Sequence, residues 1–205
     1  MNFRNRVGLF GGAFDPPHRA HLLVAQEALR QCALRRVILI PNGVAPQKEH
    51  ALETKEHRFR MVQALVRGRR GLSASRIEID REGPSYTIDT IRAMKDDCPE
   101  GLCFILGADR LLGIEAWKES QALLRSVPFI VAPRPGVALS RFSRAPYDGA
   151  TFHVLDMEPV DLSSTRVREM AGRGEDVAAW VPRGVANYVR EHGLYRTGGD
   201  RIRRG

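Results

Sequence analysis

Residues 7–41 read VGLFGGAFDPPHRAHLLVAQEALRQCALRRVILIP and contain the unit on which the predicted fold rests. Val7–Phe10 and Arg36–Ile40 are apolar runs of strand length, and Ala20–Ala33 between them carries apolar residues at helical spacing. Two buried strands that are joined through a helix lie parallel in one sheet. The stretch therefore predicts a parallel β-α-β unit.

The same alternation continues along the chain, without an internal repeat or a low-complexity segment. Further strands are expected at Ser75–Ile79, Leu102–Leu106, Val127–Ala132 and Thr151–Leu155. Helices are expected at Arg58–Val66, at Tyr86–Lys95 and in a C-terminal part over 163–193, from Ser164 to His192. The predicted fold class is α/β, a doubly wound parallel sheet with a small helical C-terminal part. We expect a single domain over 1–196 and a basic, disordered tail over 197–205.

Composition places the chain among globular proteins of ordinary size. Of its 205 residues 43% are hydrophobic and 27% are charged, a balance that fits neither a disordered nor a fibrous chain. No apolar run approaches the roughly 20 residues of a membrane helix, and the N-terminus lacks the pattern of a signal peptide. Cys32, Cys98 and Cys103 form no CxxC pair, so we expect reduced thiols and a cytoplasmic location.

The formal net charge of +8 fits nucleic acid, an anionic membrane surface or a small polyanionic ligand. Part of the charge lies in the tail, at Arg196, Arg201, Arg203 and Arg204. The rest is spread along the chain as single residues without interleaved aromatic side chains. The pattern therefore specifies neither a nucleic acid nor a membrane as partner, and it leaves a homo-oligomer open.

Chemistry is expected beyond the carboxyl ends of the strands, where ligands bind in doubly wound sheets. After the first strand comes GGAFDPPHRAH (11–21), which is neither GxGxxG nor GxxxxGK[ST]. Gly11 and Gly12 leave the backbone open to a phosphate or a ribose, and His18 and His21 share one face of a helix start, which favours anions. By itself the segment fits an anion site and a structural turn about equally. Half of a zinc site is less favoured, because the other histidines show no paired spacing.

A second segment, DLSSTRVR (161–168), favours the anion site. Ser163 or Ser164 is a natural N-cap, which would place Arg166 and Arg168 in the first turn, where the helix dipole disfavours positive charge. A bound polyanion would reverse that penalty, with Thr165 and Arg168 one turn apart on the same face. Solvated arginines are the alternative, because the penalty is only roughly a few tenths of a kcal/mol.

At these two segments the sequence closely resembles bacterial nicotinate-nucleotide adenylyltransferases, a branch of the nucleotidyltransferase superfamily. That family shows GGxFDPxHxGH after its first strand and ISSTxxR near its end, and here the segments are GGAFDPPHRAH (11–21) and LSSTRVR (162–168). The similarity continues through IPNGVAPQK (40–48), REGPSYTIDTI (81–91), FILGADRLLGIEAWK (104–118), RPG (134–136) and HGLYR (192–196). It covers nearly the whole chain and implies a Rossmann-like nucleotidyltransferase fold.

The resemblance implies adenylyl transfer from ATP to nicotinate mononucleotide, which gives nicotinate adenine dinucleotide and pyrophosphate in NAD biosynthesis. His18 and His21 would bind the α-phosphate and, with Arg168, would be the catalytic residues. ATP would be bound by Gly11, Gly12, Ala13, Phe14, Gly107, Asp109, Ser164, Thr165 and Arg168. The mononucleotide would be bound by Asn42, Lys48, Tyr86, Thr87, Trp117 and Arg134. No protein metal site is implied, because Mg²⁺ would be held mainly by the ATP phosphates.

Several acceptor-side roles have a physical argument beside an alternative. Ser85 as a cap would put Tyr86 and Thr87 in the first turn of a helix, whose N–H groups suit the carboxylate of nicotinate better than a neutral carboxamide. Trp117 could stack on the pyridine ring, although a tryptophan beside apolar residues is more often part of a core. Arg134 fits a phosphate partner, but in a long loop it would equally fit solvent.

Three positions depart from the family pattern. Ala20 replaces the glycine between the histidines, Ala13 stands where threonine is frequent, and Gln47 stands before Lys48 where histidine is frequent. None is one of the two histidines or the arginine, so we expect the chemistry to persist with altered affinity. One alternative is an adenylyltransferase for nicotinamide mononucleotide or 4'-phosphopantetheine. Another is a non-catalytic nucleotide or nucleic-acid binder.

Overall fold

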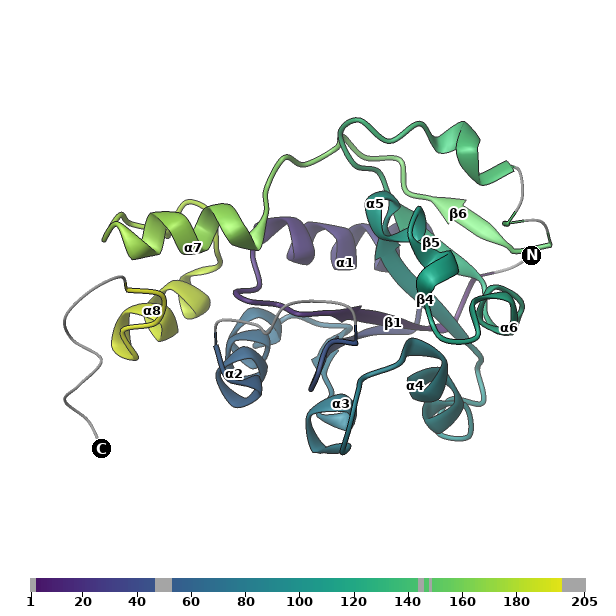
Figure 1. Cartoon of the computed structure of the whole chain (residues 1–205), viewed down its shortest axis with the longest axis horizontal. Helices are drawn as coiled ribbons and strands as arrows, with labels where there is room; N and C mark the ends of the chain where they lie inside the picture. The colour runs from purple at the N-terminus through teal and green to yellow at the C-terminus, as the bar shows by residue number, and fades with distance from the viewer. Residues whose placement is uncertain (1–2, 47–52, 144–145, 148, 197–205) are drawn as a thin grey trace.

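The computed structural model describes residues 3–46, 53–143, 146–147 and 149–196 (Figure 1). The strands of this part are Val7–Gly12 (β1), Arg36–Pro41 (β2), Leu72–Ala74 (β3), Leu102–Gly107 (β4), Phe129–Ala132 (β5) and Phe152–Val154 (β6). They pair in parallel in one six-stranded sheet of order β3-β2-β1-β4-β5-β6. The chain thus extends the sheet to one side of β1 and then, from β4, to the other side. The prediction of a doubly wound α/β fold is confirmed.

Helices connect the strands, and two more follow the sheet at the C-terminal end. They are Arg19–Gln31 (α1), Lys55–Val66 (α2), Ile77–Asp80 (α3), Thr87–Met94 (α4), Ala108–Leu111 (α5), Ser120–Ser126 (α6), Ser164–Gly172 (α7) and Arg183–Glu191 (α8), with 3-10 turns at Ile114–Ala116 (η1) and Leu139–Ser143 (η2). In Figure 1, α7 and α8 lie beyond the carboxyl end of β1, on the opposite side of the molecule from α6. The C-terminal helices are therefore next to the loop that follows the first strand.

Alternate residues of the central strands face two separate hydrophobic cores, as the two-residue period of a strand requires. In β2, Val37 and Leu39 belong to one core, while Ile38 and Ile40 belong to the other. Apolar residues of α1, α2, α7 and α8 close the first core, and those of α4, α5 and α6 close the second. Both faces of the sheet are covered, which is why its strands are continuous apolar runs in the sequence.

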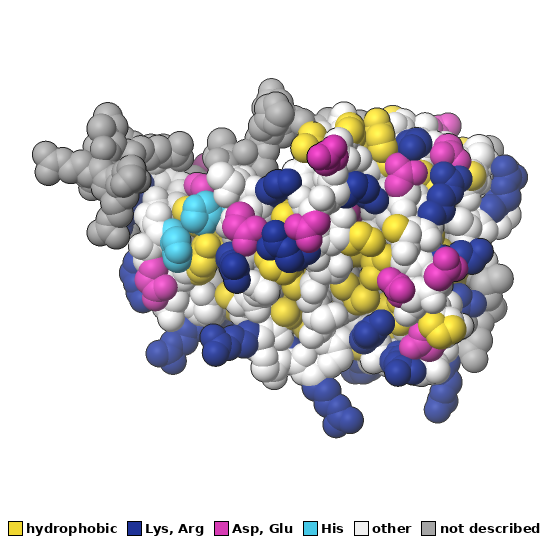
Figure 2. All heavy atoms as spheres, turned by 90° about the horizontal axis from the view of Figure 1, so that it is seen from below, with side chains coloured by type: hydrophobic (Ala, Val, Ile, Leu, Met, Phe, Trp, Pro, Cys, Tyr) yellow, Lys and Arg dark blue, Asp and Glu magenta, His cyan; other side chains and the backbone are white. Residues whose placement is uncertain are grey.

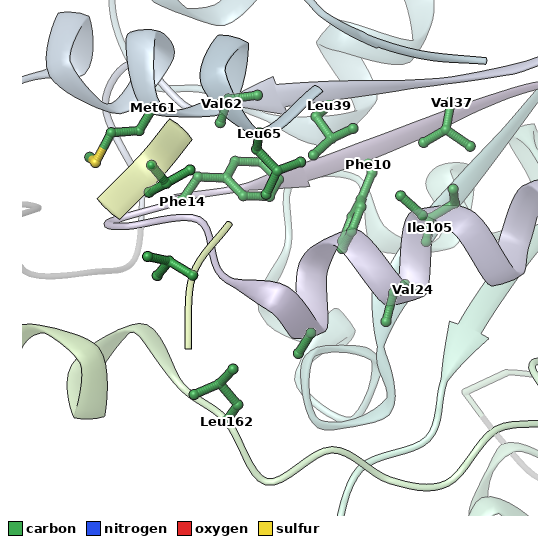
Figure 3. Close-up of a cluster of buried hydrophobic side chains, with 14 of the residues drawn as sticks. Phe10, Phe14, Val24, Val37, Leu39, Met61, Val62, Leu65, Ile105 and Leu162 are labelled. Atoms are coloured by element: carbon green, nitrogen blue, oxygen red, sulfur yellow. The ribbon is translucent and has the colours of Figure 1, made fainter. Parts of the chain in front are cut away.

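The first core extends into the loop after β1 through two phenylalanines (Figure 3). The rings of Phe10 and Phe14 meet edge to face with centroids 5.7 Å apart, and Phe14 is 2% exposed. Phe14 has a φ of 51°, in the left-handed region that residues other than glycine rarely adopt. Packing of this ring therefore holds the start of the loop in one conformation.

The prediction of a third strand at Ser75–Ile79 is wrong. β3 ends before this segment, and most of the segment belongs to α3. Its isoleucines alternate as they would in a strand. The hydroxyl of Ser75, however, accepts a hydrogen bond from the backbone N–H of Ile77 (3.3 Å), and an ion pair of Arg76 with Asp80 spans the turn (3.0 Å). Both contacts favour a helical turn.

The helical C-terminal part consists of two separate helices. α7 ends shortly before Gly174, which has a left-handed φ of 76°, and Pro182 is the N-cap of α8. α1, α2 and α4 agree with the predicted helices to within three residues at either end. The short helices α5 and α6 have no counterpart among the predicted helices. Residues 197–205, expected to form a basic tail, lie outside the described part.

Candidate active site

A cleft of about 860 Å³ opens at the carboxyl ends of β1, β2, β4 and β5. Residues that follow these strands line it, together with the starts of α4 and α7. Every predicted catalytic, ATP-binding and mononucleotide-binding residue within the described part of the chain lies on its wall. Lys48 and Gln47 lie outside the described residues. The predicted site residues are therefore neighbours in space.

His18 and His21 lie at the start of α1, the first as its N-cap and the second on its first turn. Their rings stack with centroids 3.7 Å apart, and the backbone N–H of His18 donates to Nδ1 of His21 (3.2 Å). Because Nδ1 of His21 accepts, the neutral ring carries its proton on Nε2. His18 is 1% exposed, and its Nδ1 has no hydrogen-bond partner among the described residues. The prediction that the two imidazoles share one face is confirmed.

Both imidazoles are held in their neutral form. Burial, followed by the charge of Arg134, lowers the pKa of His18 to about 3. Burial also lowers the pKa of His21 well below its ordinary value of 6.5, with smaller contributions from His18 and Arg134. Two neutral imidazoles beside the positive charge of Arg134 form a site that favours the binding of a negatively charged group.

The glycines of the first motif have a packing role that the sequence reasoning did not give them. A Cβ at Gly11 would lie 3.2 Å from the ring of Phe104, and one at Gly12 would lie 3.3 Å from the ring of Phe14. In a close-packed interior such a contact forces its neighbour to move. The side-chain space of both glycines is thus filled by aromatic rings, while their backbone remains on the cleft wall.

The start of α7 is bound to the loop that precedes α1. Nη1 of Arg168 donates to the main-chain oxygen of Asp15 (2.7 Å), which lies 153 residues earlier in the sequence. The hydroxyl of Ser164 donates to the main-chain oxygen of Pro16 (2.9 Å). Nη2 of Arg168 also donates to the hydroxyl of Thr165 (3.2 Å), as expected for residues one turn apart. The two motifs that carry the resemblance therefore meet in space.

Of the two serines predicted as N-cap of α7, Ser163 has that position, because its hydroxyl accepts from the N–H of Arg166 (3.3 Å). One detail of α7 differs from the prediction. The helix therefore begins at Ser164, and Arg168 lies on the second turn rather than the first. Arg166 is on the first turn, but its guanidinium lies 4.9 Å above the ring of Trp180, away from the cleft wall. A cation–π contact offsets the unfavourable dipole there.

Arg134 and Asp109, predicted to bind different substrates, are joined by an ion pair. Nε of Arg134 lies 3.4 Å from Oδ1 of Asp109, and its Nη1 donates to the main-chain oxygen of Val160 (3.2 Å). The side chain of Arg134 is 30% exposed, so it is not a freely solvated loop residue. A Cβ at Gly107 would collide with the carboxylate of Asp109 and lie 3.2 Å from Nε of Arg134. This packing explains the glycine at the end of β4.

The segments after β2 and before α4 form one wall of the cleft. The N–H of Ser85 donates to the main-chain oxygen of Val44 (2.8 Å), and its hydroxyl accepts from the N–H of Gly43 (2.9 Å). Contrary to the prediction, Ser85 is therefore not the N-cap of α4. Tyr86 has that position without a side-chain cap, and α4 begins at Thr87. The uncapped start of α4 thus lies at the cleft.

Trp117 fits both interpretations that the sequence left open. Its ring meets Phe104 edge to face, with centroids 6.4 Å apart, and it packs against the second core while it also lines the cleft. Beside it, Nζ of Lys118 lies 4.8 Å from the ring centroid of Tyr86 and 2.9 Å from the carboxylate of Asp89. Lys118 is on the cleft wall as well, and the sequence reasoning did not single it out.

Arg58 is a buried residue of the site that the sequence reasoning missed. It is 2% exposed and donates to the main-chain oxygens of Ala13 (2.8 Å) and Gly43 (3.1 Å). It also donates to Oδ1 of Asn42 (2.8 Å), so that the amide NH₂ of Asn42 is left as a donor on the cleft wall. The signal that could have identified Arg58 is its position on the apolar stripe of α2.

Comparisons with known proteins place the chain in a family. Residues 9–170 match the cytidylyltransferase-like family. Relatives from Exiguobacterium sibiricum and Halalkalibacterium halodurans, both named "Probable nicotinate-nucleotide adenylyltransferase", are 37% and 39% identical to the chain. The alignments cover 94% and 96% of this chain and 100% and 94% of the relatives. The chain belongs to the nicotinate-nucleotide adenylyltransferase family. It is a nucleotidyltransferase, as the resemblance of its motifs implies.

A solved adenylyltransferase shares the fold. The nicotinic acid mononucleotide adenylyltransferase of Plasmodium falciparum, in complexes with NaAD and with APC, matches with TM-scores of 0.77 and 0.76. The matches cover 92% and 94% of this chain and 96% and 98% of the Plasmodium chains, at 18% and 17% identity. Similarity at this level shows that the two proteins share a fold.

The molecule outside the cleft is relevant to possible contacts with membranes and with charged partners. Among the described residues, no helix combines the length and the apolar character that spanning a bilayer requires. Figure 2 shows the face formed by α2, α3 and α4, where positive and negative side chains are interspersed. Ion pairs here include Arg76 with Glu56 (2.9 Å) and Arg92 with Glu119 (2.6 Å). Basic side chains on this face therefore lie beside acidic ones.

Proposed function

We propose that the protein transfers the adenylyl group of ATP to nicotinate mononucleotide and releases nicotinate adenine dinucleotide and pyrophosphate. The observation that carries the proposal is the meeting of the His18–His21 pair with Arg168 in one cleft. The names of the bacterial relatives support this substrate, and so does the Plasmodium enzyme solved with NaAD. The reaction belongs to NAD biosynthesis.

The reaction needs no protein nucleophile. An oxygen of the acceptor phosphate attacks the α-phosphorus of ATP and forms a P–O bond. The bond between the α-phosphorus and the oxygen that bridges to the β-phosphorus breaks, and pyrophosphate leaves with the electron pair. Catalysis of such a transfer rests on positioning and on donors placed where charge develops. The cleft has donors of this kind at its nucleotide end.

His18 and His21 are the proposed ligands of the α-phosphate. The backbone N–H of His18 holds Nδ1 of His21, which leaves Nε2–H of His21 as a donor with a set direction. The rings are stacked at 3.7 Å and His18 is buried, so the pair has little rotational freedom to lose when the phosphate binds.

Arg168, Ser164 and Thr165 are the proposed ligands of the β- and γ-phosphates. Arg168 is positioned by a main-chain oxygen and a hydroxyl, and none of the described carboxylates pairs with it as a salt bridge. Its positive charge is therefore available to the leaving pyrophosphate. The adenosine would lie along the backbone of 11–14, with Gly107 and Asp109 at the ribose.

Nicotinate mononucleotide is proposed to bind at the other end of the cleft. The uncapped start of α4, at Tyr86 and Thr87, offers N–H groups to the carboxylate of nicotinate. Trp117 would stack on the pyridine ring, and the NH₂ group of Asn42 and the guanidinium of Arg134 would bind polar groups of the mononucleotide. Lys48 is proposed as a further ligand, although it lies outside the described residues.

Mg²⁺ is proposed to arrive bound to the ATP phosphates, where it would supply neutralisation of their charge. The described residues contain no group of three or more His, Cys, Asp or Glu side chains arranged to hold a metal ion. The acidic side chains on the cleft wall are already engaged, Asp15 with Tyr195 (2.7 Å) and Asp109 with Arg134 (3.4 Å). The donor set therefore fits a metal held mainly by the nucleotide.

A cytoplasmic location is proposed as well. Its support is that all three cysteines are free and buried. Burial raises the pKa of Cys32 to about 11 and that of Cys103 to about 12, so both stay as unreactive thiols. Such thiols are typical of a reducing compartment.

Product analysis with ATP, Mg²⁺ and one acceptor at a time tests the proposal. Nicotinate mononucleotide should give pyrophosphate and the dinucleotide, and nicotinamide mononucleotide or 4'-phosphopantetheine should give little of either. An equal rate with nicotinamide mononucleotide would overturn the acceptor assignment. Nucleotide binding without pyrophosphate from any acceptor would overturn the catalytic role and favour a binding protein.

A further inference from the structure

Tyr195 is close to the end of the described chain, yet its side chain is buried against Asp15, in the loop between β1 and α1. It is 4% exposed, and its hydroxyl donates to Oδ1 of Asp15 (2.7 Å), which lies 180 residues earlier. Its backbone N–H donates to Glu53 (3.3 Å), and its φ of 66° is left-handed. A non-glycine residue keeps such a conformation only where its surroundings hold it there.

Asp15 connects the phenol of Tyr195 to the nucleotide end of the cleft. Its carboxylate accepts from Tyr195, and its main-chain oxygen accepts from Nη1 of Arg168 (2.7 Å). Asp15 also attracts the buried guanidinium of Arg58, which holds the neighbouring carbonyl of Ala13 (2.8 Å). His18 lies three residues further along the same loop. A shift of Asp15 would therefore move both the arginine and the histidine.

The hydroxyl of Tyr195, rather than its ring, is the group that makes this link. A phenylalanine would fill the same space between α2 and the loop, but it would remove one donor from the buried carboxylate of Asp15. Burial and the negative charge of Asp15 raise the pKa of Tyr195 far above its ordinary value, so the phenol keeps its proton. A buried carboxylate that loses a donor moves or recruits another partner.

We propose that Tyr195 is a positioning residue for ATP, acting through Asp15 on Arg168 and on the loop that bears His18. This inference rests on the proposed function, because it assigns the nucleotide end of the cleft to ATP. Tyr195 does not line the cleft, and it is not a catalytic residue. Its role is to connect the end of the chain to the phosphate-binding loop.

Tyr195→Phe, compared with Tyr188→Phe, tests the inference. Tyr188 is the matched control, because its hydroxyl also bonds inside the protein, to His57 (3.0 Å), while its side chain lies off the cleft wall. We expect Tyr195→Phe to lower kcat/KM for ATP about tenfold and to leave KM for nicotinate mononucleotide within twofold of wild type. Tyr188→Phe should change neither constant. Assays are run at a temperature at which circular dichroism shows both variants to be folded.

Two outcomes would overturn the inference. The first is a Tyr195→Phe variant with a lower melting temperature but an unchanged kcat/KM for ATP, which would make the tyrosine merely structural. The second is an equal change in KM for both substrates, which would show a general disturbance. Combining Tyr195→Phe with Arg168→Lys adds a further check. The double variant should lose less than the product of the two single losses, because both act through Asp15.

Failure of the proposed function is distinguished by a binding measurement that needs no acceptor. Calorimetry with a non-hydrolysable ATP analogue reports the nucleotide end alone. If the wild type binds the analogue but makes no dinucleotide from nicotinate mononucleotide, only the acceptor assignment fails. Weaker binding of the analogue by Tyr195→Phe, and not by Tyr188→Phe, would then still support the positioning role.

Discussion

At the proposed nucleotide end of the cleft, His18 is 1% exposed and Arg168 is held by the main chain of a loop 153 residues away. At the proposed acceptor end, by contrast, the side chains of Lys118 and Asp89 are 40% and 31% exposed and pair chiefly with each other. The first end contains a buried histidine and a half-buried arginine that is held by the backbone. The second is built from an exposed ion pair, a half-buried tryptophan and an uncapped helix start.

This difference indicates that the nucleotide end is more rigid than the acceptor end. Buried polar groups with backbone partners are placed by folding itself, so their geometry exists before a substrate arrives. An exposed ion pair contributes only about 0–1 kcal/mol and rearranges readily. We therefore expect the nucleotide end to be intolerant of substitution, and the acceptor end to tune affinity with smaller effects.

The largest effect is expected at His21. His21→Ala removes the proposed Nε2–H donor to the α-phosphate, which should lower kcat by roughly 10²–10³ and raise KM for either substrate only modestly. Pyrophosphate release at saturating substrates measures this. His192→Ala is the control, since His192 is an exposed histidine off the cleft wall. Wild-type turnover in His21→Ala would remove this residue from the catalysis.

An intermediate effect is expected in the pH dependence of stability. The pKa of His18 in the folded protein, about 3, is below its ordinary value of 6.5, so the unfolded chain takes up the proton first as the pH falls. The stability due to neutral His18 is complete above pH 6.5 and decreases toward pH 3, with a loss of about 2 kcal/mol at pH 5. His21 acts in the same direction.

His18→Asn checks this expectation while keeping a residue that is favourable at an N-cap. Urea unfolding at pH 7 and pH 5 should show a smaller loss of unfolding free energy in the variant than in the wild type. The same loss in both proteins would mean that His18 is not held neutral. Burial of His18 would then not explain the expected difference between the nucleotide end and the acceptor end.

The smallest effect is expected at the acceptor end. Trp117→Ala removes the proposed stacking surface and should raise KM for nicotinate mononucleotide roughly 3- to 10-fold while leaving KM for ATP nearly unchanged. Trp180→Ala is the control, because the Trp180 ring lies under Arg166 and off the cleft wall. A rise in KM for ATP alone would show that the pyridine ring binds elsewhere. Such a result would reverse the two ends of the cleft.

Much of the fold could be predicted because its signals are local. The apolar runs of β1 and β2 and the helical spacing of α1 lie within 35 consecutive residues and are confirmed. The prediction of a strand at 75–79 was wrong because a short alternation of isoleucines fits a strand or a helical turn. The hydroxyl of Ser75 favours the helical turn. The prediction of Ser85 as N-cap was wrong because its hydroxyl accepts a hydrogen bond from the N–H of Gly43, on a different segment.

The sequence by itself determined the β1-α1-β2 unit and the two motifs at residues 11–21 and 162–168, since periodicity, glycines and caps act over a few residues. Only the tertiary structure decided which polar groups are buried together, such as Arg58 with Asn42 and Tyr195 with Asp15. The physical reason is that a buried donor is stable only beside its acceptor. Whether two residues 180 positions apart become such neighbours depends on how the whole chain packs.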